Sequence, residues 1–248
     1  MTELVHLESL DQVAVITLDS EHNRNALSRQ LVTELSQHLA TADADPDVRA
    51  IHVRSAGRVF CSGADLTEAT GGGMVEGAKA LVALQRQIMT AEKPILVELN
   101  GPVRAGGLGI VGAADIVIAA ESVTFALTEV RLGLAPYVIS LSLLPRLTPR
   151  ASSDTFLTGR PFGAIEAQSY GLVTRAVADE AVAGAVATTL GELAEGSPQG
   201  LRETKKMLNR ALVANLDALG DEFAASSARL FGSDEAKTAM MAFLNRKK

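Results

Sequence analysis

The segment that most restricts the fold of this 248-residue chain is RAGGLGIVGAAD, residues 104–115. Gly107, Gly109 and Gly112 spell G-x-G-x-x-G, the pattern of a turn that binds the pyrophosphate of a dinucleotide. The apolar run 116–120 predicts a strand that begins only four residues after Gly112. A helix that starts at Gly107 therefore has room for only about two turns.

This spacing argues against a dinucleotide site. In such a unit the first strand runs almost directly into the first glycine, and a full helix follows. Here the predicted strand 95–99 (ILVEL) is separated from Gly107 by seven residues, so an NAD-dependent dehydrogenase is the least favoured function. Close packing of a helix on a strand accounts for Gly109 and Gly112. A glycine-rich turn that enters a helix also leaves N–H groups unpaired, and such groups bind anions.

Apolar runs and helix-like stretches alternate through the first half of the chain. Strands are predicted at 13–18, 48–54, 95–99 and 116–120. The repeat of Leu31, Leu35 and Leu39 predicts a helix from an N-cap at Ser28 to about residue 41, and another helix is predicted at 77–91. The alternation indicates an α/β core with parallel strands. After Glu129 the chain is predicted to be mostly helical, at 141–147, 152–158, 164–170, 179–195, 198–216 and 233–246.

Charge and composition exclude several classes of function. The chain has 23 Lys and Arg against 29 Asp and Glu, a net charge of −6, which argues against nucleic acid or an anionic membrane as a partner. No apolar run approaches the ~20 residues of a membrane span, and the first residues lack a signal-peptide pattern. Cys61 is the only cysteine, and the four histidines have no metal-ligand spacing. We therefore expect a cytoplasmic protein without a disulfide or a metal site.

A second loop, FCSGADL (60–66), follows a predicted strand and turns at Ser62–Gly63. Taken alone, it is an ordinary strand-to-helix turn with Asp65 as a helix N-cap. Two N–H groups are usually arranged around an oxyanion, however. Together with the glycine run, this loop predicts a two-donor oxyanion site.

The two loops belong to longer stretches that resemble a known family. AGRVFCSGADL (56–66) and EKPILVELNGPVRAGGLGIVGAADIVIAA (92–120) are similar to the signature segments of the enoyl-CoA hydratase/isomerase, or crotonase, superfamily. Further similarity, in the same order along the chain, lies in NRNAL (23–27), FALTEVRLGLAP (125–136) and TGRPFGAIEAQSYGLVTRAV (158–177). The resemblance covers nearly the whole chain.

The resemblance implies a fold and an assembly. The fold is an α/β, crotonase-like ββα spiral, in which two near-perpendicular sheets are wrapped by helices. Residues 1–190 would form the spiral core with the CoA site and the oxyanion hole, and residues 191–248 a helical C-terminal trimerisation region. The expected assembly is a homotrimer or a dimer of trimers. Apolar residues on the last helices (Leu230, Phe231, Met240 and Phe243) agree with such an interface.

The resemblance also implies a ligand, a CoA thioester, which is the substrate rather than a cofactor. The backbone N–H groups of Ala64 and Gly106 would bind the thioester oxygen, where negative charge develops when a neighbouring proton is removed. Tyr137 is expected to line the acyl pocket. Arg104 is expected to pair either with an acidic acyl tail or with a surface carboxylate. The residues implied to lie along the CoA are Arg24, Ala26, Ala64, Asp65 and Leu66.

Hydratases of this superfamily commonly carry two glutamates, and this chain has one of them. The first position falls on Gly109 and the second on Glu129. Glu129 follows the apolar run 123–127, so burial should raise its pKa toward neutrality. The alternative is a solvated loop glutamate paired with Arg131.

One carboxylate suffices for a 1,3-proton shift, which favours double-bond isomerisation. The resemblance also extends to a branch whose hydratases of branched or glutaconyl-type enoyl-CoAs have glycine at the first position. Hydration of a substituted 2-enoyl-CoA therefore stays open. A non-catalytic acyl-CoA-binding homologue is the alternative from another class.

Overall fold

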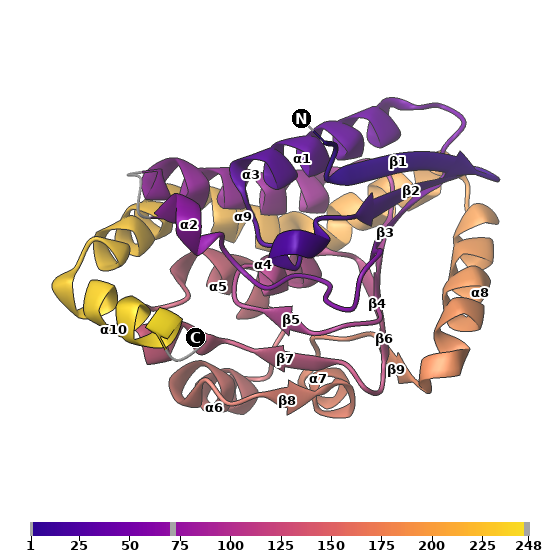
Figure 1. Cartoon of the computed structure of the whole chain (residues 1–248). Coiled ribbons are helices and arrows are strands. Elements are labelled where there is room, and N and C mark those ends of the chain that lie inside the picture. The colour runs from indigo at the N-terminus through magenta and orange to yellow at the C-terminus, as the bar shows by residue number, and fades with distance from the viewer. Residues whose placement is uncertain (1, 70–72, 246–248) are drawn as a thin grey trace.

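The computed structural model describes residues 2–69 and 73–245, and a six-stranded sheet runs through its centre (Figure 1). Its first two strands form an antiparallel hairpin, and every other neighbouring pair is parallel. The strand order is β1 (Val5–Leu10), β2 (Val13–Leu18), β3 (Ala50–Ser55), β4 (Ile95–Leu99), β6 (Ile116–Ala120) and β9 (Arg175–Val177).

A second, smaller sheet consists of β5 (Val103–Arg104), β7 (Thr124–Ala126) and β8 (Phe162–Gly163). In Figure 1 its strands extend sideways from the large sheet, which is seen edge-on. Along the chain, β4 leads to β5, and β6 leads to β7. The two segments lie side by side, because β4 pairs with β6 in the large sheet and β5 pairs with β7 in the small one. Single bridges from Leu27 to Ala64 and from Cys61 to Val103 repeat this pattern in the earlier turns of the chain. The successive turns form the spiral that the resemblance predicts.

Helices cover both faces of the large sheet. Helix α1 (Arg29–Ala44) begins where the Ser28 hydroxyl accepts the Leu31 N–H at 3.2 Å, as predicted. Helix α8 (Val182–Ala194) packs on one face, and α3 (Met74–Thr90) lies on the other, where α9 (Pro198–Phe231) packs on it (Figure 1). The remaining helices are α2 (Leu66–Ala69), α4 (Gly107–Ala113), α5 (Tyr137–Leu143), α6 (Pro149–Thr158), α7 (Ala164–Tyr170) and α10 (Asp234–Asn245), with short 3-10 turns η1 (Glu21–Asn23), η2 (Thr128–Leu132) and η3 (Asp179–Ala181).

Helix α4 is as short as the glycine spacing predicts, with seven residues, all of them buried. A polar cluster holds the segment that follows it. The Asp115 carboxylate accepts hydrogen bonds from Lys205 at 2.7 Å and from Asn209 at 3.1 Å, both on α9. Arg146 donates to the carbonyl groups of Gly112 and Ala114. The long helix α9 is thereby tied to the end of α4.

The largest differences from the predicted boundaries lie in two helices. The helix expected at 141–147 is α5, which begins directly after Pro136 and ends before Pro145, because proline has no N–H to donate to a helix. The helix expected to end at residue 216 continues to Phe231. It lies against α3 beyond residue 216, since a Cβ atom on Gly220 would lie 2.9 Å from a methyl carbon of Val82.

The proposed division of the chain at residue 190 lies inside α8 and stays a prediction. In the described part of the chain, no helix combines the length and the apolar character needed to cross a membrane.

Candidate active site

Two loops from neighbouring turns of the spiral meet at the proposed oxyanion hole. Each places a left-handed residue directly before its donor: Gly63 (φ +99°) before Ala64, and Ala105 (φ +45°) before Gly106. A Cβ atom on Gly63 would lie 2.9 Å from the Cβ of Ala105, and one on Gly106 would lie 3.6 Å from the N atom of Ala64. The loops are therefore in van der Waals contact.

The contact continues at the next glycine. A Cβ atom on Gly107 would lie 2.6 Å from the Cβ and 2.9 Å from the Sγ of Cys61, so only glycine fits without displacing a loop. The Arg104 N–H donates to the Cys61 carbonyl at 2.9 Å and joins the two loops. Burial raises the pKa of Cys61 to about 12, which agrees with a structural thiol.

The N–H groups of Ala64 and Gly106 are free. Among the described residues neither of them donates to a protein acceptor. A polar N–H without a partner beside a buried loop is available to a ligand. The two groups lie close together, as the predicted pair of donors requires, and their role as an oxyanion hole stays a prediction.

Glu129 is the one carboxylate that the structure brings to this region from η2. Strand pairing explains its position: Arg104 pairs with Ala126, the Ala105 N–H donates to the Ala126 carbonyl at 3.1 Å, and Glu129 follows three residues later. The loop that bears Glu129 therefore adjoins the loop that bears Gly106.

Glu129 is half-buried, but its Oε2 atom is buried and has no hydrogen-bond partner within the described residues. Burial raises its pKa to about 7, although a hydrogen bond from its own backbone N–H acts in the opposite direction. Arg131 does not pair with it but donates to the Thr158 carbonyl at 3.4 Å. The surroundings of the Glu129 carboxylate thus agree with the desolvation expected from the apolar run. The alternative, an ion pair with Arg131, does not form.

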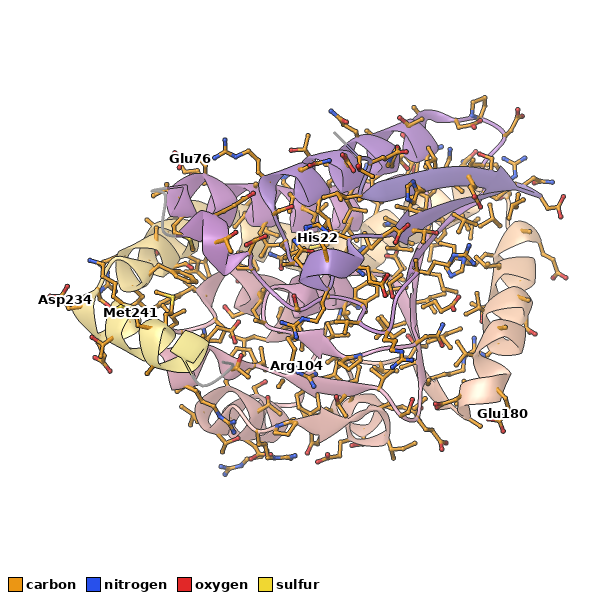
Figure 2. The ribbon with its side chains drawn as sticks, viewed as in Figure 1. His22, Glu76, Arg104, Glu180, Asp234 and Met241 are labelled. Carbon is orange, nitrogen blue, oxygen red and sulfur yellow. The ribbon has the colours of Figure 1, made fainter. Side chains whose placement is uncertain are left out.

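Arg104 lies on the small sheet (Figure 2). Its half-buried guanidinium donates to the carbonyl and to the hydroxyl of Thr124, and burial lowers its pKa. Thr124 precedes Ala126 on β7, so the guanidinium leans away from Glu129 along that strand. No carboxylate in the described part of the chain forms an ion pair with Arg104.

The residues expected along the CoA come together around the first loop. Arg24 is exposed, and its carbonyl accepts the Ser62 N–H at 3.1 Å, while Ala26 is buried. Asp65 caps α2 by accepting the Thr67 N–H at 2.9 Å, and its carboxylate also accepts from Asn23 at 3.2 Å. Burial raises the pKa of Asp65, but the hydrogen bonds from Thr67 and Asn23 outweigh it and lower the value. Leu66 opens α2; its side chain lies outside the described set.

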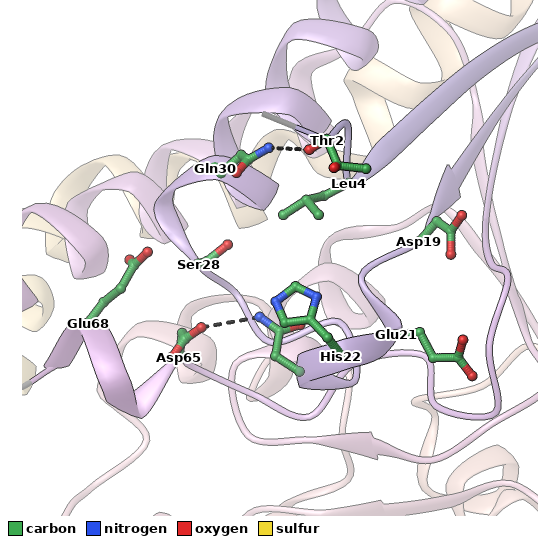
Figure 3. A pocket seen from close by; sticks show the side chains of 10 residues that line it. Thr2, Leu4, Asp19, Glu21, His22, Ser28, Gln30, Asp65 and Glu68 are labelled. Carbon is green, nitrogen blue, oxygen red and sulfur yellow. Dashed lines mark hydrogen bonds between the residues drawn. The ribbon is translucent and has the colours of Figure 1, made fainter.

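A groove of about 590 Å³ borders this edge of the site (Figure 3). Four carboxylates and His22 line it, and Asp65 forms part of its wall. Such a surface repels the phosphates of CoA, so the groove is not a candidate for them. Its lining residues are Thr2, Leu4, Asp19, Glu21, His22, Asn23, Ser28, Gln30, Asp65 and Glu68.

The position of the absent first glutamate is filled by residues that the sequence reasoning missed. A Cβ atom on Gly109 would lie 3.1 Å from Ile139 and 3.3 Å from the amide carbon of Gln85. Gln85 and Ser142 are fully buried and joined by a 2.7 Å hydrogen bond. The only signal in the sequence is a glutamine beside the apolar stripe of α3.

Tyr137 is the first residue of α5 and is half-buried. Its ring packs edge-on against Phe223 of α9, with 5.2 Å between the ring centres. Helix α10 packs on η2, where a Cβ atom on Gly133 would lie 3.3 Å from the N atom of Ala236. The described residues contain no cluster of His, Cys, Asp and Glu suited to a metal ion.

The spiral of paired sheets, with two free N–H groups where its turns meet, defines a crotonase-type fold. The chain belongs to the enoyl-CoA hydratase/isomerase family, whose model matches residues 8–248.

Individual relatives agree with this assignment. The chain is 34% identical to a putative enoyl-CoA hydratase of Thermus thermophilus over 79% of its own length and 80% of the relative. A crystal structure of a putative enoyl-CoA hydratase from Mycobacterium avium paratuberculosis superposes with a TM-score of 0.93 at 43% identity, covering 98% of this chain and 97% of the other. A methylmalonyl-CoA decarboxylase complexed with 2S-carboxypropyl-CoA superposes at 0.87 with 25% identity, covering 99% and 97%.

Proposed function

We propose that this chain processes acyl-CoA thioesters as an enzyme. The N–H groups of Ala64 and Gly106 hold the thioester oxygen, and Glu129 is the single acid/base. The observation that carries the proposal is the Glu129 carboxylate, whose buried Oε2 atom has no partner among the described residues and whose pKa is raised by burial to about 7. A group with this pKa is partly ionised at neutral pH, so it can both remove and return a proton.

The two N–H groups supply the other half of the chemistry. Removing a proton from the carbon next to a thioester moves negative charge onto the carbonyl oxygen. Two preorganised donors stabilise that charge in the transition state, and each is worth about 3 kcal/mol in comparable sites. The names of the relatives, and the CoA ligand of the decarboxylase, support a CoA thioester as the substrate.

Two reactions match this set of groups: isomerisation of a double bond by a 1,3-proton shift, and hydration of a substituted 2-enoyl-CoA. A non-catalytic acyl-CoA binder is the rival function, and it rests on Gly109, where a second carboxylate is absent. A desolvated, unpaired carboxylate is costly to retain in a protein that only binds. The state of Glu129 therefore favours the enzyme.

The decisive experiment is turnover of a panel of 2-enoyl- and 3-enoyl-CoAs of varied length and branching, followed by the absorbance of the conjugated thioester. We expect turnover of at least one member and binding of its saturated analogue by calorimetry. Binding without turnover of any member, by a folded protein, identifies the non-catalytic binder. Absence of both overturns the proposal.

The assembly proposed is a homotrimer or a dimer of trimers. Helices α9 and α10 expose Met207, Leu208 and Met241, and they leave Leu230, Phe231 and Met240 half-covered. Phe243 also belongs to the predicted interface, but its side chain lies outside the described set. Light scattering should give about three or six times the 25.9 kDa chain mass. A stable monomer contradicts the assembly.

A further inference from the structure

The side of α4 that bears the oxyanion donor faces helix α3. Gly106 and Gly109 are one turn apart on this side, and a Cβ atom on Gly106 would lie 3.6 Å from Leu81. Gln85 follows Leu81 by one turn of α3, and its amide would lie 3.3 to 3.4 Å from a Cβ atom on Gly109. The Gln85 amide thus lies about 5 Å further along the helix pair than the oxyanion donor.

Both polar atoms of this amide form hydrogen bonds inside the protein. Its Nε2 donates to the carbonyls of Leu81 and Val138, both at 3.2 Å, and its Oε1 accepts the Ser142 hydroxyl at 2.7 Å. The side chains of Gln85 and Ser142 are both completely buried. An amide in this state neither ionises nor turns toward a ligand.

This environment also offers few hydrogen-bonding partners to a reacting water. A buried water needs two to four polar partners. Of the three atoms nearest to a Cβ at Gly109, two belong to the Gln85 amide and the third is a methyl carbon of Ile139, while the nearby Ser142 hydroxyl bonds to Gln85. Hydration requires a water that is held, deprotonated and added to C3, together with a proton for C2. A 1,3-proton shift requires only one base, and that base is Glu129.

We propose that Gln85 determines which reaction this site performs. Its amide fills the space beside Gly109, keeps out a second carboxylate and water, and restricts the site to moving the double bond of a 3-enoyl-CoA to the 2-position. This inference rests on the proposed function, because it assigns the reaction of the same site.

The reaction balances with the groups present. The Glu129 carboxylate removes a proton from C2 of the 3-enoyl thioester, and the electron pair of that C–H bond spreads over C2, C4 and the thioester oxygen. The N–H groups of Ala64 and Gly106 stabilise the charge on the oxygen. The Glu129 carboxylic acid then returns the proton to C4, which leaves a C2–C3 double bond and regenerates the carboxylate. No water is consumed.

The first test compares two rates of the wild-type protein. A 3-enoyl-CoA and the 2-enoyl-CoA of the same chain length are supplied separately, and isomer and 3-hydroxyacyl-CoA are separated by chromatography. We expect isomerisation to exceed hydration by at least about 10²-fold, the usual worth of one acid/base group. Hydration as fast as isomerisation overturns this inference and leaves the proposed function intact. Turnover of neither substrate type at any chain length of the panel refutes the proposed function itself.

The second test makes room for the absent group. Gly109→Glu together with Gln85→Ala supplies a carboxylate and the space for it, and we expect the ratio of hydration to isomerisation to rise at least tenfold. Gln85→Ala alone opens space for water but supplies no carboxylate to activate it, so the ratio should rise less than in the double variant. Gln87→Ala is the matched control, because Gln87 bonds to Ser36 on α1 instead of facing α4. An unchanged ratio in a double variant with a wild-type circular dichroism spectrum overturns the inference, and the wild-type comparison tests it even if that variant does not fold.

Discussion

The two halves of the candidate site are built in different ways. The oxyanion half consists of backbone N–H groups on two loops that glycines hold in contact, so several residues determine each donor. The acid/base half is one side chain, Glu129, on a short 3-10 turn. A backbone donor cannot be removed by shortening a side chain, but an added atom can displace it. The carboxylate can be removed by replacing a single oxygen.

The largest effect should come from Glu129→Gln. The amide is nearly isosteric and the donors are backbone groups, so fold and acyl-CoA affinity should persist while turnover falls by ~10²–10⁴. Steady-state kinetics on the best substrate of the panel measures the loss. Glu121→Gln, at an exposed position, is the control. Turnover within a few-fold of the wild type would mean that Glu129 is a structural loop residue.

The same substitution should change how stability depends on pH. The folded chain keeps Glu129 protonated up to about pH 7, whereas the free side chain ionises near 4.5. Between these values the unfolded chain releases a proton that the folded chain retains, so the free energy of unfolding falls as pH rises. Over this pH range the free energy of unfolding of the wild type should fall by about 3 kcal/mol more than that of Glu129→Gln. Urea unfolding at pH 5 and pH 8 measures it, and parallel curves for the two proteins would contradict it.

A smaller effect should follow from an added methyl group in the oxyanion half. Gly107→Ala places a Cβ atom against Cys61 and should lower the free energy of unfolding by about 1–3 kcal/mol, with a loss of turnover as the loops separate. Gly77→Ala is the matched control, because nothing lies within 4 Å of that position on α3. The control should stabilise the protein by about 0.5–1 kcal/mol. Equal unfolding midpoints for the two variants would show that the loop contact is unimportant.

The smallest effect should come from Ala105→Gly. The left-handed backbone of Ala105 costs about 1–2 kcal/mol, and glycine removes that cost. Glycine also makes the unfolded chain more flexible, which cancels about 0.4–1 kcal/mol of that gain in the free energy of unfolding. We expect the free energy of unfolding to rise by no more than about 1 kcal/mol, as measured by thermal unfolding. A clear decrease would show that the methyl group of Ala105 supports the loop by packing.

Much of the large sheet could be predicted because its strands carry long apolar runs. The strands at 95–99 and 116–120 and the helix at 164–170 match the structure to the residue. The small sheet was missed, since strands of two or three residues are too short to show a periodic pattern. Helix α9 was predicted too short, because its packing on α3 and α5 arises only in the folded chain.

The two halves of the site also differed in how far the sequence could predict them. The two candidate donors were named from the loop motifs and the family resemblance, and neither N–H group donates to an acceptor in the part of the chain that the structure describes. The raised pKa of Glu129 followed from the apolar run before it. The Gln85–Ser142 pair could not be foreseen, because residues 85, 109 and 142 approach one another only through the packing of three helices.

The spiral has a consequence for the order in which a growing chain can complete its structure. Each turn pairs with the turn made just before it, so the sheet can be assembled from the N-terminus while the ribosome is still extending the chain. Both oxyanion loops have been synthesised by residue 107, and Glu129 follows about twenty residues later. Lys205 and Asn209, which secure Asp115 behind α4, are translated some ninety residues after it. A nascent chain stalled before α9 would thus contain every proposed catalytic group while the anchor of its oxyanion helix is still incomplete.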